Sequence, residues 1–228
     1  MKGLTIAVDG PSSAGKGTVA KGVARSLGYA YLDTGAMYRA VALIASRKGL
    51  SLDDEASLAE VAVRLTFAFE WNGEALKVIV DGEDVTGAIR TGPMGQAASA
   101  VSRHPAVRRA LTVQQRRHGD EGGVVMDGRD IGTVVLPDAD LKVFLDGDLD
   151  ERARRRHQEL RDKGDDVTFE EVRGALEQRD RQDRERATAP LRQAEDAVRV
   201  DTTHMTIREA IEQVLALVDT ELRARRGR

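Results

Sequence analysis

The chain has 228 residues, of which 41% are hydrophobic and 32% are charged, and its formal net charge is −3. This composition is typical of a globular protein long enough to bury a substantial core. A slightly negative chain is not suited to coating nucleic acid or an anionic membrane, and without cysteine it has no disulfides or thiolate metal ligands. No apolar run approaches the roughly 20 residues of a membrane helix. Because a strand is expected to start at residue 4, we expect no signal peptide and a cytoplasmic protein.

The first predicted elements are a strand, a glycine-rich turn and a helix. Residues 4–8 are an apolar run of strand length, and apolar residues recur at helical spacing over 19–27. The turn between them is a predicted phosphate-binding loop, composed of Gly10, Pro11, Ser12, Ser13, Ala14, Gly15, Lys16, Gly17 and Thr18. Glycines let successive N–H groups curl around anionic oxygens, and the following helix adds the positive end of its dipole. We expect Lys16 to reach the terminal phosphates of a nucleoside triphosphate and Thr18 to reach Mg²⁺.

A second anion-binding position is predicted after the next strand. Residues 29–32 form a short predicted strand, and a helix follows from residue 36. Thr34 is the expected N-cap of this helix, and its hydroxyl and the Arg39 guanidinium would both lie near the helix N-terminus. These residues alone leave two interpretations open, an anion site or a plain cap beside a solvated arginine.

A small antiparallel sheet is predicted within residues 65–90. Apolar and polar residues alternate over 65–71 and again over 76–80, which is the period of a strand. Asn72-Gly73 between them is a strong hairpin signal, and a further turn leads into residues 85–90. We expect this insert to move against the main body of the protein.

The rest of the chain alternates predicted helices and strands. The expected helices cover about 51–64 with Ser51 as the cap, a segment from Pro93, a segment after Pro105, and about 149–161, 168–186 and 206–225. The expected strands are 124–126, 141–145 and 198–200. Strands separated by helices predict an α/β fold with a five-stranded parallel sheet that has helices on both faces.

Three predicted strands end in aspartate, at Asp33, Asp127 and Asp146. Ligands of open parallel sheets bind at the carboxyl ends of the strands, so these carboxylates would face the phosphate-binding loop and its Mg²⁺. Each could instead be a turn residue or a helix cap. We favour that simpler role for Asp146 and the functional role for Asp127.

The segment 151–186 is rich in arginine, but acidic residues balance the basic ones, which argues against a nucleic-acid surface. Most of these side chains are expected on solvated helix faces. Arg179, Asp183 and Arg186 differ, because their spacing of i, i+4 and i+7 predicts one helix face beside a helix end. Arginines ordered in this way suit phosphate binding. Together with a phosphate-binding loop and Mg²⁺, they favour phosphoryl transfer, which requires positioning and charge neutralisation rather than a protein nucleophile.

Four stretches together resemble the bacterial-type cytidylate kinases over essentially the whole chain. They are VDGPSSAGKGT at 8–18, LDTGAMYR at 32–39, DGRDIGTVV at 127–135 and RDRQDRERATAPL at 179–191. The GKGT ending, with Gly17 between the lysine and the hydroxyl residue, is similar to the loop of nucleoside monophosphate kinases. The resemblance implies a single P-loop kinase domain that transfers the γ-phosphoryl of ATP to CMP or dCMP with Mg²⁺. Its parts would be a core at 1–64 and 91–228, a nucleotide-monophosphate-binding β insert at about 65–90 with following helices to about 118, and a short arginine-rich lid at about 152–186.

The resemblance also implies the residues that bind CMP, namely Thr34, Arg39, Ser99, Arg108, Arg129, Asp130, Arg179 and Asp183. Arg39 and Arg129 would bind the phosphate. Asp130 would accept a hydrogen bond from the cytosine amino group, with Ser99 and Arg108 also reading the base. Arg179 and Asp183 would meet the ribose, and Thr34 would lie near the phosphate.

The catalytic residues implied by the resemblance are Lys16, Arg129, Arg179 and Arg186. Arg186 would reach the transferred phosphoryl group as an arginine finger within the same chain. Asp127 and Thr18 would be the metal-site residues, Asp127 through an ordered water. The whole loop Gly10–Thr18, with Lys16 and Thr18 included, would hold the ATP phosphates.

Two alternatives remain at this stage. One is a P-loop kinase for another small acceptor such as UMP, AMP or a shikimate-like compound, for which Ser99, Arg108 and Asp130 would not be needed. The other is a nucleotide-dependent switch, which does not require a second set of phosphate-binding arginines. We expect a monomer that binds nucleotides but neither nucleic acid nor membrane, because no large apolar stripe is left after the core is assigned.

Overall fold

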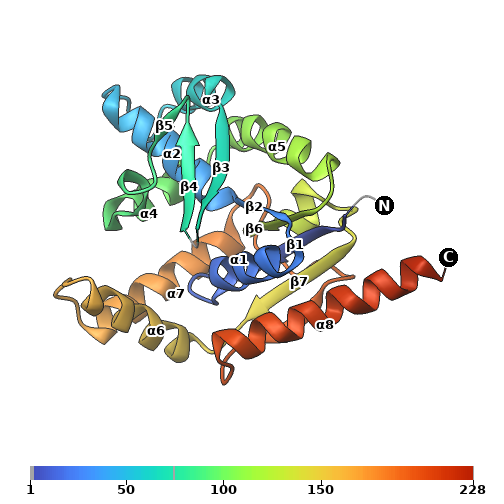
Figure 1. Cartoon of the computed structure of the whole chain (residues 1–228). Helices are drawn as coiled ribbons and strands as arrows, with labels where there is room; N and C mark the ends of the chain where they lie inside the picture. Colours follow the sequence, from blue (N-terminus) through green and yellow to red (C-terminus); the bar gives the residue numbers. More distant parts are fainter. Residues whose placement is uncertain (1–2, 74, 228) are drawn as a thin grey trace. The chain divides into compact units, whose positions relative to one another are not determined.

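The main sheet has five strands in the order β2-β6-β1-β7-β8 (Figure 1). The structure, a computed structural model, describes residues 3–73 and 75–227. The strands are β1 (Thr5–Asp9), β2 (Ala30–Asp33), β6 (Val124–Asp127), β7 (Leu141–Asp146) and β8 (Val198–Asp201). β1 pairs in parallel with β6 and β7, and β7 pairs in parallel with β8. The predicted five-stranded parallel sheet is confirmed.

Apolar runs explain why these strands lie inside the protein. Every residue of β6 is buried, as are the last four residues of β1. Ile6 on β1 lies opposite Val125 on one side and Leu141 on the other, so apolar side chains stack across the middle of the sheet. A parallel strand buried on both faces needs such a continuous apolar run rather than an alternating one.

Contacts divide the chain into two compact units, Met1–Tyr31 with Glu121–Arg228, and Leu32–Asp120. The helical elements of the first unit are α1 (Lys16–Leu27), η2 (Ile131–Val135), α6 (Leu149–Asp162), α7 (Phe169–Glu185) and α8 (Ile207–Arg226). Helices α1 and α8 pack against each other, α1 also against β6 and α8 against β7. The short π-helical turn η2, which was not expected from the sequence, packs against β1.

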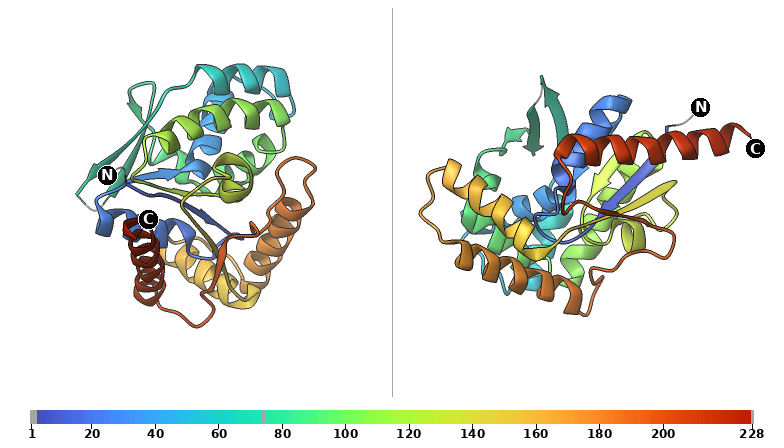
Figure 2. Two further views of the ribbon diagram at one scale, coloured as in Figure 1. Left: turned by 90° about the vertical axis from the view of Figure 1, so that its right-hand side faces the viewer. Right: turned by 90° about the horizontal axis from the view of Figure 1, so that it is seen from below.

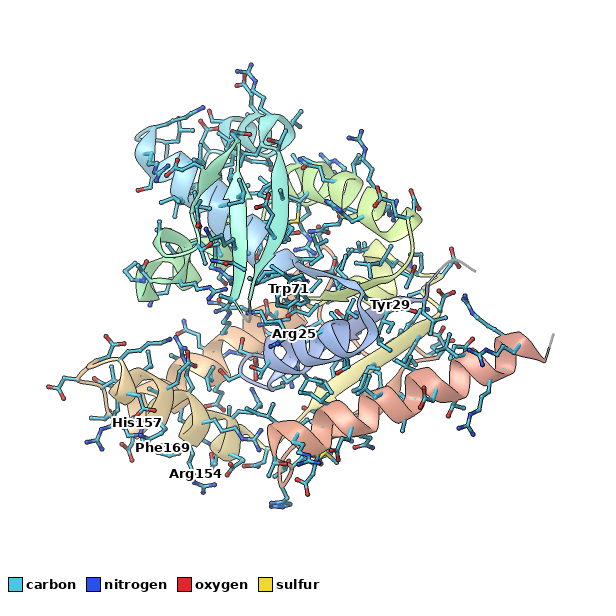
Figure 3. All side chains as sticks on the ribbon, in the orientation of Figure 1. Arg25, Tyr29, Trp71, Arg154, His157 and Phe169 are labelled. Carbon is cyan, nitrogen blue, oxygen red and sulfur yellow. The ribbon has the colours of Figure 1, made fainter. Side chains whose placement is uncertain are left out.

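Helices α6 and α7 form a pair with a small core of its own (Figure 2). Its buried residues are Ala153, Val172 and Leu176, with Leu149, Leu160, Val167 and Phe169 packed around them. The rings of His157 and Phe169 meet edge to face between the two helices (Figure 3). The Asp148 side chain caps α6, and Thr168 and Glu171 form a capping box on α7. The arginine-rich segment, for which we predict a lid, therefore contains a pair of packed helices.

The second unit contains the predicted antiparallel sheet. The helices and strands of this unit are α2 (Thr34–Arg47), α3 (Glu55–Arg64), β3 (Phe67–Asn72), β4 (Ala75–Val80), β5 (Glu83–Asp84), η1 (Ala88–Arg90), α4 (Gly92–Val101) and α5 (Pro105–Asp120). β3 pairs with β4 so that Phe67 lies opposite Val80 and Trp71 opposite Leu76. The three buried apolar residues of β4 thus face the half-buried aromatic residues of β3.

Some local predictions for the second unit were wrong. The helix expected over 51–64 begins only at Glu55, because Asp54 rather than Ser51 caps it and accepts from Ser57 N. The stretch 85–90, which was expected to belong to the small sheet, lies outside it, because the third strand is Glu83–Asp84 and a 3₁₀ turn follows at Ala88–Arg90.

The hairpin also differs by one residue from the expected Asn72-Gly73 turn. Asn72 still pairs, with Ala75, so the turn starts at Gly73 and its second residue lies outside the described residues.

Among the helices of the described residues, none is long and apolar enough to cross a membrane.

Candidate active site

The loop that follows β1 has the backbone of an anion-binding turn. Gly10, Ser13 and Gly15 have φ angles of 148°, 59° and 84°, and α1 begins directly afterwards at Lys16. A Cβ atom on Gly10 would lie 1.9 Å from the carbonyl oxygen of Leu145 on the neighbouring strand β7. Only glycine fits this position. The expected strand, loop and helix are thus present, with the N-terminus of α1 at the loop.

Lys16 lies inside this loop rather than in solvent. It is 5% exposed, and its Nζ donates to the carbonyl oxygen of Pro11 at 2.6 Å. Burial and the neighbouring charge of Arg129 lower the pKa of Lys16, against the opposing effect of nearby carboxylates. An anion bound in the loop would place negative charge next to the Lys16 ammonium group, whose charged form burial and Arg129 disfavour. Thr18, in the first turn of α1, is exposed.

Two arginines and two aspartates form a buried cluster beside the loop. Arg129 Nε donates to Asp183 Oδ2 at 2.8 Å, and its Nη2 donates to the hydroxyl of Ser12 at 2.9 Å. Arg186 lies 3.4 Å from Asp130 Oδ1 and 3.8 Å from Asp183 Oδ1. The structure thus brings these four residues together beside the loop, although the nearest of them in sequence, Arg129, lies 111 positions after Thr18.

Burial and charge act in opposite directions on this cluster. Burial alone would raise the pKa of Asp183, but the charges of Arg129, Arg179 and Arg186 and the hydrogen bond from Arg129 hold it below its ordinary value. Burial would lower the pKa of Arg129, but the carboxylates around it, Asp183 first, raise it. The cluster is therefore an array of fixed charges.

The helix-face prediction for these arginines was partly wrong. Arg179 and Asp183 are on α7, but α7 ends at Glu185, and Arg186 has extended backbone with φ −59° and ψ 137°. The i+7 spacing therefore does not position Arg186. Its Nε instead donates to the carbonyl oxygen of Ala189, so the turn after the helix orients the guanidinium toward Asp130.

Two strand-end carboxylates of the first unit organise the loops around the site. Asp9 accepts hydrogen bonds from Ile131 N at 2.8 Å and Gly132 N at 2.7 Å, and so fixes the backbone that follows Asp130. Burial raises the pKa of Asp9 to about 6, although both hydrogen bonds act in the other direction. Asp127 Oδ1 accepts from the Tyr31 hydroxyl at 2.7 Å.

The other two strand-end aspartates have structural roles. Asp146 accepts from Gly147 N and pairs with Arg199, as we had favoured. Asp33, at the end of β2, is a helix cap. Its Oδ1 accepts from Ala36 N as the N-cap of α2, and its Oδ2 pairs with Arg39 at 2.9 Å.

The prediction of Thr34 as the N-cap was therefore wrong by one residue. Thr34 is the buried first residue of α2, because the longer Asp33 carboxylate reaches the free N–H groups of the first turn. Arg39 is held by the same carboxylate, and its buried Nε has no hydrogen-bond partner among the described residues. A buried guanidinium N–H in this state is suited to an anionic ligand.

The remaining predicted residues of the second unit lie near one another. Arg108 is buried, with its guanidinium 5.4 Å from the centre of the Tyr38 ring. Its Nη1 donates to the carbonyl oxygen of Ser102, whose hydroxyl donates to the carbonyl oxygen of Ser99. Helices α4 and α5 thus bring Ser99 and Arg108 together through Ser102, and Tyr38 of α2 adds a cation–π contact.

Sequence reasoning missed several residues around the phosphate-binding loop. Asp9 ends a strand just as Asp127 does, so the same rule could have found it. Asp180 lies between two arginines and has no spacing that marks it, yet it is buried and contacts Ser12. Thr202 Oγ1 lies 2.8 Å from the carbonyl oxygen of Asp146 and 3.3 Å from that of Ala14 in the loop.

The loop is compatible with Mg²⁺ bound together with a nucleotide. No group of three or more carboxylate or histidine ligands occurs among the described residues. Mg²⁺ in nucleotide sites usually keeps several waters and takes only one or two protein ligands beside the phosphates. The exposed Thr18 and the Asp127 carboxylate, whose Oδ2 lies 3.9 Å from a Cβ built on Gly17, fit this mode of binding.

The parallel sheet, the phosphate-binding loop after its first buried strand and the arginine cluster beside that loop define a P-loop kinase. The family model of cytidylate kinase matches residues 6–220. The chain belongs to the cytidylate kinase family.

Curated relatives agree with this assignment. A protein named cytidylate kinase from Geobacter sp. (strain M21) is 51% identical over 92% of this chain and 90% of its own length. Another with that name, from Geobacter sulfurreducens, is 48% identical over 99% of this chain and 97% of its own. A crystal structure of an uncharacterized protein from Eubacterium ventriosum has a TM-score of 0.52 at 14% identity, covering 96% of this chain and 99% of that one. This last likeness shows the fold alone.

Proposed function

We propose that this chain transfers the γ-phosphoryl group of ATP to CMP or dCMP, giving ADP and CDP or dCDP. The observation that supports this most directly is the contact between Arg129 and Ser12. It joins the phosphate-binding loop to a buried cluster of arginines and aspartates. A nucleotide switch needs the loop but not the cluster, whereas a phosphoryl transfer between two nucleotides needs both.

The loop and its lysine would bind the donor. Backbone N–H groups of the loop Gly10–Thr18 would surround the ATP phosphates, except at Pro11, which has none, and at Ser12, whose N–H donates to Asp180. Lys16 would neutralise the terminal phosphates. Bound Mg²⁺, with Thr18 and a water on Asp127 among its ligands, would neutralise further charge on the phosphates. Arg186 would stabilise the charge that develops on the transferred group, because its guanidinium is fixed by the turn at Ala189.

The residues that the resemblance assigns to CMP would recognise the acceptor. Arg39, whose buried Nε has no partner among the described residues, and Arg129 would bind the CMP phosphate. Asp130 would accept from the cytosine amino group, a donor that uracil lacks. For the remaining residues we propose base contacts by Ser99 and Arg108, ribose contacts by Arg179 and Asp183, and a position of Thr34 near the phosphate.

A coupled assay of ADP formation with each acceptor tests the proposal. CMP, dCMP, UMP, AMP and shikimate are compared at equal concentration with ATP and Mg²⁺. We expect the highest kcat/KM with CMP or dCMP. Rates with UMP or AMP that equal or exceed those with CMP would contradict the proposed acceptor.

Asp130→Ala tests the proposed reading of the base. Loss of one base-reading carboxylate costs about 1–3 kcal/mol of discrimination, so we expect the KM for CMP to rise about tenfold or more. The KM for ATP should change far less. Asp138→Ala, an exposed aspartate in the following turn, is the matched control and should leave both constants unchanged. Equal increases in the KM for CMP and the KM for ATP would contradict the proposal that Asp130 reads the base.

A monomeric state, a cytoplasmic location and the division into core, β insert and lid stay predictions. Sedimentation velocity of the purified chain tests the first of these.

A further inference from the structure

Side chains from helices α6 and α7 form hydrogen bonds with both backbone groups of Ser12 in the phosphate-binding loop. Asp180 on α7 accepts from Ser12 N through Oδ1 at 2.9 Å. Arg152 on α6 donates from Nη1 to the Ser12 carbonyl oxygen at 2.8 Å. A residue of the loop is thus fixed by partners that lie 140 and 168 positions away in the sequence.

Arg152 and Asp180 also form a deeply buried ion pair. Arg152 Nη1 lies 2.6 Å from Asp180 Oδ2, and the two side chains are 5% and 3% exposed. Arg152 Nε donates to the Gly147 carbonyl oxygen at 2.9 Å, so the guanidinium is bonded on two sides. A buried ion pair adds little stability over an apolar pair of similar size, because both charges lose their hydration. What distinguishes this pair is therefore its hydrogen bonds to the backbone of Ser12, and not its contribution to the stability of the fold.

Helix α7 connects this pair to the residues proposed to act in transfer. Asp180 directly follows Arg179 and precedes Asp183 by less than one helical turn. The same rigid helix therefore bonds the donor loop at Ser12 and carries side chains of the arginine cluster. A shift of α7 would move both at once.

We propose that Arg152 and Asp180 are positioning residues, which fix the phosphate-binding loop relative to α7 so that donor phosphates and the arginine cluster are aligned for transfer. The pair acts through the loop backbone and does not touch the reacting atoms. This inference rests on the proposed function for its kinetic readout only. The state of the loop can also be measured without any substrate.

Four variants separate positioning from a merely structural role. They are Asp180→Ala, Asp180→Asn, Arg152→Met and the double variant Arg152→Met with Asp180→Ala. Each single variant leaves a buried charge without its partner, whereas the double variant removes both charges and should regain much of the melting temperature. Arg154→Met is the matched control on α6, since its side chain is 63% exposed (Figure 3).

The kinetic readout is kcat against KM, with whichever acceptor the wild-type protein phosphorylates. Misplacement of reacting groups by a fraction of an ångström to 1 Å lowers rates strongly, so we expect kcat to fall about 10- to 100-fold in Asp180→Ala, Arg152→Met and the double variant. KM values should stay within about threefold. Asp180→Asn keeps an acceptor for Ser12 N and should retain more of kcat than Asp180→Ala.

Hydrogen exchange without nucleotide gives a readout that does not depend on the reaction. In the double variant, the amides of residues 10 and 12–18 should exchange faster, while those of β1 and β7 should exchange as in the wild type.

Three results would overturn the inference. The first is recovery of kcat together with the melting temperature in the double variant. The second is a rise in the KM for ATP in Arg152→Met but not in Asp180→Ala, which would make Arg152 a nucleotide ligand. The third is unchanged exchange of the loop amides. If the wild-type protein does not phosphorylate CMP or dCMP, the proposed function is wrong, but the hydrogen-exchange measurement still tests the positioning role.

Discussion

Removal of the Asp183 carboxylate should destabilise the fold by an amount that follows from its contacts. Asp183 is 9% exposed and lies between Arg129, at 2.8 Å and 19% exposed, and Arg186, at 3.8 Å and 9% exposed. Removing one partner of a buried ion pair costs about 3–5 kcal/mol, since the other charge stays buried without compensation. Because Asp130 remains near Arg186 and Arg129 is partly hydrated, we expect the lower end for Asp183→Ala, about 3 kcal/mol.

This cost can be measured as a change in melting temperature. For a chain of this length, 1 kcal/mol shifts the melting temperature by roughly 2–4 °C, so the expected loss is about 6–12 °C. Asp183→Asn keeps an acceptor for Arg129 Nε and should lose less. Glu185→Ala, an exposed carboxylate on the same helix, is the control and should stay within about 0.5 kcal/mol of the wild type.

The pH dependence of the difference gives an independent check. The pKa of Asp183 is lower in the folded state than its ordinary value, so its ionised form stabilises the fold at pH values above the unfolded pKa of about 3.9. That contribution is lost as the pH falls through the folded pKa. In urea titrations, the difference in unfolding free energy between the wild type and Asp183→Asn should be constant from about pH 6 to 8, where the Asp183 carboxyl is ionised in both the folded and the unfolded state. This difference should narrow below about pH 4. A gap no larger than that of Glu185→Ala at pH 7 would refute the reasoning.

Two further predictions concern the loop and the transfer step. Gly10→Ala should destabilise the protein by about 3 kcal/mol or more, because the positive φ is strained and the new Cβ would overlap the carbonyl oxygen of Leu145. Gly28→Ala, also at positive φ but with open space, should cost only about 1–2 kcal/mol in the same thermal unfolding measurement, and equal losses would contradict the steric argument. Arg186→Ala should lower kcat about 100-fold in the coupled assay, equivalent to about 2.7 kcal/mol of transition-state stabilisation. The control Arg184→Ala, at an exposed arginine of α7, should leave kcat unchanged. If Arg186→Ala changes only KM, Arg186 binds the ground state and does not stabilise the transition state.

Residues that act through local backbone geometry could be predicted from the sequence. The phosphate-binding loop, the buried strands around it and the hairpin at 67–80 depend on contacts between neighbours along the chain and on the period of apolar residues. The wrong predictions of helix caps were off by one to three residues. Asp33 rather than Thr34 caps α2, and Asp54 rather than Ser51 caps α3, because several polar residues before a helix compete for the same N–H groups.

Residues that act across long sequence separations were decided only by the tertiary structure. Neither Arg152 nor Asp180 has a local pattern that sets it apart from the other charged residues of its helix, and their contacts with Ser12 depend on how α6 and α7 pack. Arg186 was assigned to a helix face, although a turn orients it. The sequence by itself determined which anion-binding loop this protein has and where it begins. Only the tertiary structure decided which charged side chains are buried beside that loop, because burial and ion pairing depend on the packing of distant segments rather than on spacing.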